Sequence, residues 1–60
     1  MSFTEWRTRA RMLAALPRLA AGEPVAAVGR GVGYVNASAF IAAFRRTFGV
    51  TPRAYFELGG

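Results

Sequence analysis

Glycine and proline residues divide this 60-residue chain into segments of at most about 20 residues. Proline lacks an amide hydrogen and glycine tolerates left-handed backbone, so both commonly mark helix ends. Residues that favour helix starts follow the breaks or open the chain: Ser2 with Glu5, Asn36, and Thr51 with Pro52. The pattern predicts an all-α domain without strands, with four helices at about residues 3–21, 24–30, 37–48 and 52–58.

Two features inside these segments predict local departures from regular helix. Pro17 lies within the first segment, where its ring crowds the carbonyl of Leu13, so we expect an interruption or kink there. Gly29, Gly31 and Gly33 alternate at and after the end of the second segment, and we expect a tight turn in which glycine supplies positive φ angles. These glycines match a dinucleotide-binding loop poorly, because that loop needs a preceding strand and a longer spacing.

The first segment has two apolar stripes when it is drawn as a helix. One stripe consists of Phe3, Trp6, Ala10, Leu13 and Ala20. The other consists of Met12, Ala15, Leu16 and Leu19. A helix that is apolar around most of its circumference is usually buried on several sides. The rest of the chain supplies too few apolar side chains to cover both stripes, so we expect one of them to stay open and to permit self-association.

The segment 37–48 separates its two faces more cleanly. Aromatic and small apolar residues recur at helical spacing on one side, at Phe40, Ala43, Phe44 and Phe48. The opposite side carries Ser38, Ile41, Ala42 and Arg45. Aromatic rings that stack on single-stranded nucleic acid usually lie on a sheet, so the core interpretation is favoured for the Phe stripe. We expect the core to combine Phe40 and Phe44 with Leu16, Val28 and Val32.

Composition excludes most chemistry. The chain has no Cys, His, Asp, Lys or Gln, and its three glutamates are far apart in sequence. Acid–base catalysis and zinc or iron coordination depend on these groups, so we expect no enzyme activity, no metal and no cofactor. Eight arginines give a net charge of +5, which favours phosphate polyanions or anionic membrane surfaces as partners. No apolar run approaches a membrane span and no signal peptide opens the chain, so we expect a cytoplasmic location.

Residues 24–48 have the organisation of a helix-turn-helix DNA-binding unit, with a short helix, a glycine-containing turn and a second helix. The second helix of such a unit enters the major groove. Its outward face here begins at Ser38, and its side chains are small enough to approach base edges. Arg45 and Arg46 follow on this helix and can meet phosphates. The sequence therefore predicts double-stranded DNA as the partner.

The same residues resemble a known family, the AraC/XylS-type transcription regulators. The resemblance lies in Gly33-Tyr34, Ser38-Ala39-Phe40, Phe44-Arg45-Arg46, Phe48-Gly49 and Thr51-Pro52 with Tyr55. It places this span at the end of that family's DNA-binding domain, which carries two helix-turn-helix units joined by a linker helix. It implies that residues 1–22 are the linker helix and residues 23–60 the second unit. The first unit is then missing from this chain.

The resemblance also assigns, by position, the residues that face DNA. They are Asn36, Ala37, Ser38, Ile41, Ala42 and Arg45, with Arg46 as a phosphate contact. Ala37 and Ala42 lack hydrogen-bonding groups where some relatives have longer polar side chains, so direct base readout is expected to be weak. A thymine methyl group against Ile41 or Ala42, and a hydroxyl contact from Ser38, are the contacts that remain.

Two other interpretations stay open from the sequence alone. Arginine, tryptophan and phenylalanine on helices also suit a cationic peptide that lies on an anionic membrane surface. Capped turns break the Phe stripe, however, and the matched motif specifies a folded unit, so DNA is the favoured partner. The third interpretation is a truncated remnant with no activity of its own. Titration with DNA and with anionic vesicles separates the first two, and a folding test without ligand addresses the third.

Overall fold

The structure, a computed structural model, describes residues 2–59 and contains four helices within them. They are α1 (Phe3–Ala20), α2 (Val25–Gly31), α3 (Ala37–Phe48) and α4 (Pro52–Gly59). No strand occurs in this described range, so the predicted all-α class is confirmed. Helix boundaries agree with the prediction to within one residue. The start of α2 moves to Val25 because Pro24, with ψ 139°, caps that helix instead of joining it.

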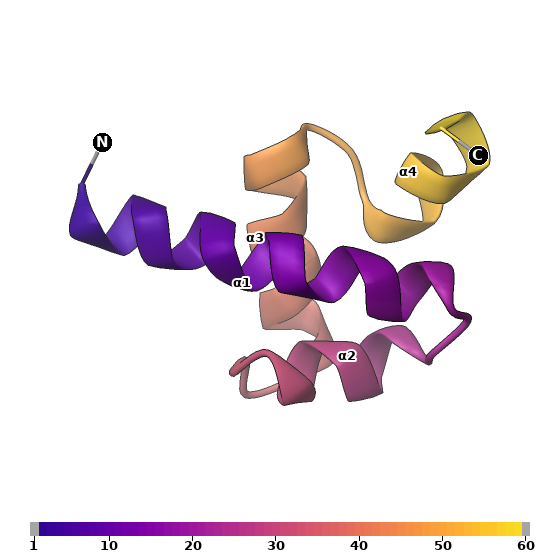
Figure 1. Ribbon diagram of the computed structural model, residues 1–60, viewed down its shortest axis with the longest axis horizontal. Coiled ribbons are helices and arrows are strands. Elements are labelled where there is room, and N and C mark those ends of the chain that lie inside the picture. Colours follow the sequence, from indigo (N-terminus) through magenta and orange to yellow (C-terminus); the bar gives the residue numbers. More distant parts are fainter. Residues whose placement is uncertain (1, 60) are drawn as a thin grey trace.

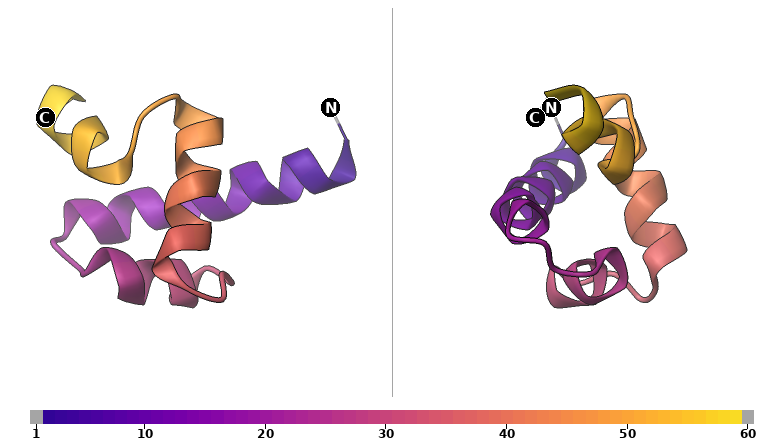
Figure 2. Two further views of the ribbon diagram at one scale, coloured as in Figure 1. Left: turned by 180° about the vertical axis from the view of Figure 1, so that it is seen from behind. Right: turned by 90° about the vertical axis from the view of Figure 1, so that its right-hand side faces the viewer.

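Helix α3 packs against each of the other three helices, and α1 is the longest helix. In Figure 1, α2 folds back beneath the C-terminal half of α1, and α3 crosses behind α1 at a steep angle. Figure 2 shows α4 on one side of α3 and the N-terminal half of α1 on the other. This half of α1 extends beyond the rest of the molecule, whose principal dimensions are 30 × 21 × 18 Å.

The predicted helix caps are present. The hydroxyl of Ser2 accepts from the Glu5 amide at 3.1 Å, and the Glu5 carboxylate accepts from the Ser2 amide at 3.2 Å, which completes a capping box. Asn36 Oδ1 accepts from the Ala39 amide at 2.8 Å and starts α3. Gly49 ends α3 with a φ of 82°, a left-handed conformation in which glycine avoids the strain of a side chain.

Helix α1 continues through Pro17 to Ala20, in agreement with the predicted range, and the kink expected at Pro17 stays a prediction. Pro17 lies in the last part of the helix, where only the hydrogen bond of its own missing amide is lost. Its carbonyl still accepts from the Ala21 amide at 3.0 Å. Leu16 and Leu19, on either side of it, pack against the core and hold the helix in place.

The expected turn conformation holds for one of the three alternating glycines. Gly33 has a φ of 106°, but Gly29 and Gly31 are helical residues of α2 without positive φ. Close packing explains Gly29, because a Cβ atom there would lie 2.8 Å from Cβ of Phe40 on α3. At Gly31, an added Cβ would meet the guanidinium group of Arg18 on α1. These two glycines therefore let neighbouring elements approach the α2 backbone.

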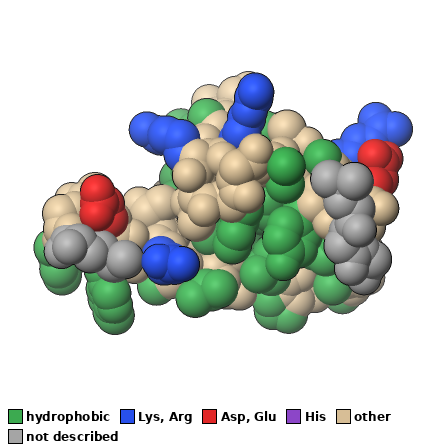
Figure 3. Space-filling model, turned by 90° about the horizontal axis from the view of Figure 1, so that it is seen from above, with side chains coloured by type: hydrophobic (Ala, Val, Ile, Leu, Met, Phe, Trp, Pro, Cys, Tyr) green, Lys and Arg blue, Asp and Glu red, His purple; other side chains and the backbone are tan. Residues whose placement is uncertain are grey.

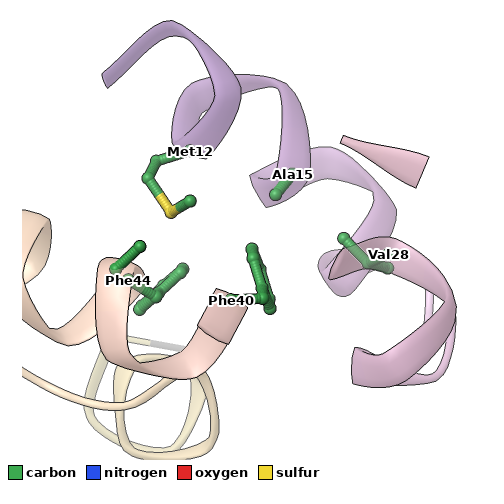
Figure 4. Close-up of a cluster of buried hydrophobic side chains, with 6 residues drawn as sticks. Met12, Ala15, Val28, Phe40 and Phe44 are labelled. Carbon is green, nitrogen blue, oxygen red and sulfur yellow. The ribbon is translucent and has the colours of Figure 1, made fainter. Parts of the chain in front are cut away.

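The core lies where α1, α2 and α3 meet. It consists of Met12, Ala15, Val28, Phe40, Ala43 and Phe44, and Figure 4 shows five of them, with labels, pointing toward one another from the three helices. Burial of Val28, Phe40 and Phe44 confirms the predicted Phe stripe as core. Leu16 and Val32, also predicted in the core, are half-buried at its edge. The rings of Phe44, Phe48 and Tyr55 continue the packing toward α4, with centroids 4.6–5.8 Å apart.

The two apolar stripes of α1 have opposite environments, as the sequence predicts. Met12 and Ala15 of the second stripe are fully buried, and Leu16 and Leu19 pack against them. In the first stripe, Phe3 is 72% exposed, Trp6 61% and Leu13 54%. Figure 3 shows hydrophobic side chains projecting from the N-terminal end of the molecule. We call the first stripe the open face of α1.

Candidate nucleic-acid interface

The outward side of α3 carries a shallow groove that brings together most of the predicted DNA-facing residues. The lining residues are Ser38, Ile41, Ala42, Arg45, Arg46, Gly49 and Thr51. The Phe stripe on the inward side of α3 fixes which residues point outward, because Phe40 and Phe44 are fully buried. Asn36 and the left-handed Gly49 set the two ends of the helix, so this face runs the full length of α3.

Two of the seven predicted residues lie outside this groove. Asn36 is exposed at the start of α3, and its side-chain oxygen Oδ1 accepts the capping hydrogen bond, which leaves the side-chain nitrogen Nδ2 free to donate to a ligand. Ala37 is half-buried in the first turn. Ile41 lines the groove but is half-buried and packs against the core, so only part of its side chain is accessible. Ala42, by contrast, is exposed.

The groove is basic and contains no acidic side chain among its lining residues. Arg45 and Arg46 are both exposed and, within residues 2–59, take part in no ion pair. Ion pairs form elsewhere, between Arg18 and Glu23 and between Arg53 and Glu57. Two guanidinium groups beside a hydroxyl and small apolar side chains suit phosphate and base-edge contacts.

An ion pair between Arg18 and Glu23 connects the end of α1 to the residues just before α2. Arg18 Nη2 lies 2.8 Å from Glu23 Oε1, and Arg18 Nε donates to the same carboxylate at 3.1 Å. The hydrogen bond from Arg18 holds the pKa of the Glu23 carboxyl below its usual range and raises the pKa of Arg18. The pair spans the turn between α1 and α2, so it holds the end of α1 beside the start of α2.

Sequence reasoning missed two residues at the carboxyl end of the interface. Thr51 and Gly49 line the groove because the chain turns back at the end of α3, a bend that no outward-face pattern on α3 reveals. Val35, just before the cap of α3, is 82% exposed but does not line this groove.

Within residues 2–59, none of the helices has the length and apolar character required to cross a lipid bilayer. The four helices are short or carry several charged side chains, as α1 does with its arginines.

Comparison with known proteins agrees with this geometry. A family model described as a helix-turn-helix domain matches residues 1–57. The chain is 36% identical over 55 residues to the HTH-type transcriptional regulator NimR of Escherichia coli (strain K12). That match covers 92% of this chain and 20% of the relative, so the chain spans about a fifth of the relative's length. No solved structure matches the chain significantly.

Proposed function

This chain belongs to the AraC-type helix-turn-helix family, the DNA-binding modules of transcription regulators, and we propose that α3 is its recognition helix in the major groove of double-stranded DNA. The observation that carries this proposal is the division of α3 into two faces. Its inward face is buried core, and its outward face is a basic groove with exposed Arg45 and Arg46 and no acid.

Most of the affinity in this proposal comes from the DNA backbone. Arg45 and Arg46 contact phosphates, and such contacts give dissociation constants of roughly 10⁻⁴–10⁻⁶ M for nonspecific DNA at physiological salt. Base readout is weak, because the face offers one hydroxyl, at Ser38, and the methyl groups of Ala42 and half-buried Ile41. Asn36 and Ala37 stand at the leading end of α3 and contribute there through the Asn36 amide nitrogen and a methyl group.

We propose that residues 1–22, which contain α1, are the linker helix, and that residues 23–60 form the second helix-turn-helix unit; Met1 and Gly60 lie outside the described residues. The support is the open face of α1, on which Phe3, Trp6 and Leu13 are exposed. Soluble proteins rarely leave such a row uncovered. Either another helical unit of the same regulator or a second copy of this chain covers it.

Such a module acts by binding and positioning, without a catalytic step, a metal or a cofactor. Its place of action is chromosomal DNA, and hence the cytoplasm of a bacterial cell. The exposed Phe3 and Trp6 beside Arg7 keep an anionic membrane surface as the competing partner to be tested.

The test is titration of the chain with a mixed-sequence duplex and, separately, with anionic phospholipid vesicles. We expect the chain to bind the duplex, with a binding constant that decreases with salt on a log–log plot. The magnitude of this slope should decrease by about 1.8 in the Arg45→Ala, Arg46→Ala double variant, because each lost phosphate contact removes about 0.9. Arg53→Ala is the matched control, because Arg53 is paired with Glu57 on α4. Unchanged duplex binding by the double variant would contradict the proposed surface, and preferential vesicle binding would favour the membrane interpretation.

A further inference from the structure

A second groove lies between the N-terminal half of α1 and the C-terminal half of α3. Its lining residues are Thr4, Glu5, Thr8, Arg9, Tyr34, Ala43, Arg46 and Thr47. The N-terminal half of α1, which supplies four of these residues, lies on the opposite side of α3 from α4 (Figure 2). Most of its side chains are polar, and they come from α1, from α3 and, for Tyr34, from the turn before α3. None of the residues contributed by α1 belongs to the surface assigned to DNA above.

Charge in this groove is mainly positive. Arg9 on α1 and Arg46 on α3 are both exposed, and neither takes part in an ion pair within residues 2–59. Glu5 is the one acid among the lining residues, and its carboxylate already accepts the Ser2 amide in the capping box. Basic side chains stand on the surface formed by the N-terminal half of α1 and the carboxyl end of α3 in Figure 3.

Arg9 differs from the other three arginines of α1. The guanidinium of Arg7 lies 5.6 Å from the Phe3 ring centroid, and that of Arg11 lies 5.8 Å from the Tyr34 centroid. Arg18 is paired with Glu23. Across residues 2–59, Arg9 is the arginine of α1 that has neither an ion pair nor a ring contact. Its guanidinium group therefore keeps its donors for a ligand.

The two grooves adjoin at Arg46, which lines both of them. A duplex that places base edges against α3 also carries phosphates on either side of those bases, one for each 3.4 Å of axis along each strand, approximately. Some of these phosphates must therefore pass beside α3. The groove toward α1 offers them Arg46 first and then Arg9, with the Thr8 hydroxyl nearby.

We propose that this second groove holds the phosphate backbone that flanks the base pairs contacted by α3, with Arg9 and Arg46 binding phosphates from two different helices. The proposal rests on the proposed function and adds α1 to the DNA-binding surface. Helix α1 then packs against the core through one stripe and contacts DNA through Arg9. A phosphodiester fits because it is anionic and presents oxygen acceptors to guanidinium and hydroxyl donors.

The experiment compares Arg9→Gln with Arg7→Gln in the full 60-residue chain. Both replacements remove one charge from the same exposed stretch of α1, and the net charge of the two variants is equal. Binding of a mixed-sequence duplex is measured from 0.05 to 0.3 M salt, a range of about sixfold around the physiological value. Thermal melting of each variant checks that folding is retained.

We expect Arg9→Gln to reduce the magnitude of the logarithmic salt slope by about 0.9, which corresponds to one phosphate contact. Over the tenfold interval between 1 M and 0.1 M salt, this change weakens binding at 0.1 M roughly eightfold. Arg7→Gln should leave the slope unchanged, and Arg9→Lys should restore it. The inference would be overturned if the parent and Arg9→Gln had equal salt slopes, or if Arg7→Gln and Arg9→Gln lost equal DNA affinity. Either result would leave the recognition role of α3 intact. A parent chain that binds no duplex would overturn both.

Discussion

Two adjacent residues of α1, Met12 and Leu13, show how differently one helix can use its two apolar faces. Met12 is completely buried between α2 and α3, whereas Leu13 is 54% exposed. Both are large, flexible hydrophobic side chains, and their residue types alone do not show which of them is buried. The difference is one of direction, because successive residues of a helix point about 100° apart and the other helices cover one side of α1 only.

The two stripes of α1 differ in burial along the whole helix. The buried stripe meets the aromatic core through Met12 and Ala15, while the open face carries Phe3 and Trp6 on the part of α1 that extends beyond the other helices. Hydrophobicity alone therefore does not decide burial in a chain of this size. The number of other residues that can reach a given side of the helix decides it.

The largest expected effect concerns stability on the covered side. Met12→Ala removes a fully buried side chain from between three helices, and we expect it to lower the free energy of unfolding by about 2–5 kcal/mol. Leu13→Ala, at the neighbouring exposed position, should change it by about 0.5 kcal/mol or less. Chemical or thermal unfolding of both variants, followed by circular dichroism, provides the comparison.

Because a domain this small is marginally stable, Met12→Ala can be fully unfolded at 25 °C, which counts as the expected result. Met12→Leu is the accompanying variant that keeps the volume and should cost less than about 1.5 kcal/mol. Equal losses from Met12→Ala and Leu13→Ala would show that both faces of α1 are covered in solution, contrary to the structure.

The next effect concerns association through the open face. If a second copy covers this face, Trp6→Gln should weaken self-association at least about tenfold, because burial of one large apolar side chain stabilises by roughly 1.5–3 kcal/mol and a tenfold change corresponds to 1.4 kcal/mol. Sedimentation over a range of concentrations measures it. Val35→Gln is the control, since Val35 is also exposed but lies at the far end of the α2–α3 turn.

A parent chain that stays monomeric at every concentration and unfolds cooperatively would contradict self-association through the open face. It would show that the open face tolerates water without a second copy. The open face would then be left for another unit of the regulator.

The smallest effect concerns pH and the Arg18–Glu23 pair at the covered end of α1. The hydrogen bond from Arg18 lowers the pKa of the Glu23 carboxyl in the folded chain. Ionised Glu23 therefore stabilises the fold above the ordinary carboxyl pKa of 4.5, and this contribution is lost as the pH falls below that value. The difference in unfolding free energy between the parent and Glu23→Gln should therefore be largest near pH 7 and narrow in acid. Urea unfolding of both proteins between pH 3 and pH 7 measures it.

Subtracting the unfolding free energy of Glu23→Gln from that of the parent removes the contribution of the other carboxyl groups, because Glu5 and Glu57 are present in both proteins. Both partners of the pair are more than a third exposed, so added salt should reduce the difference as well. A difference that is independent of pH would show that the pair contributes nothing to stability.

Much of the fold was predictable because it depends on local signals. Residues 37–48 form a helix in the structure as predicted, since Asn36 caps one end and Gly49 stops the other. Burial of Phe40 and Phe44 followed from helical spacing. Five of the seven predicted DNA-facing residues line one groove for the same reason, as they occupy the side of α3 opposite this stripe. Whether any of them contacts DNA stays a prediction.

Other features depend on how the helices meet, which no single segment encodes. The need for glycine at position 29 arises from the approach of Phe40, 11 residues further along the chain. The continuity of α1 through Pro17 depends on packing of Leu16 and Leu19 against the core. The groove between Arg9 and Arg46 exists only because α3 crosses α1, and its lining residues are far apart in the sequence.

Local sequence signals predict the helix positions, the two apolar stripes on the first helix and the basic outward face of the third. These follow from capping, turn residues and helical periodicity, which act over a few residues. The packing of the helices sets which stripe is covered, brings Arg9 and Arg46 into one groove and partly buries Ile41. These depend on the crossing of helices, where close packing of specific side chains sets the distances.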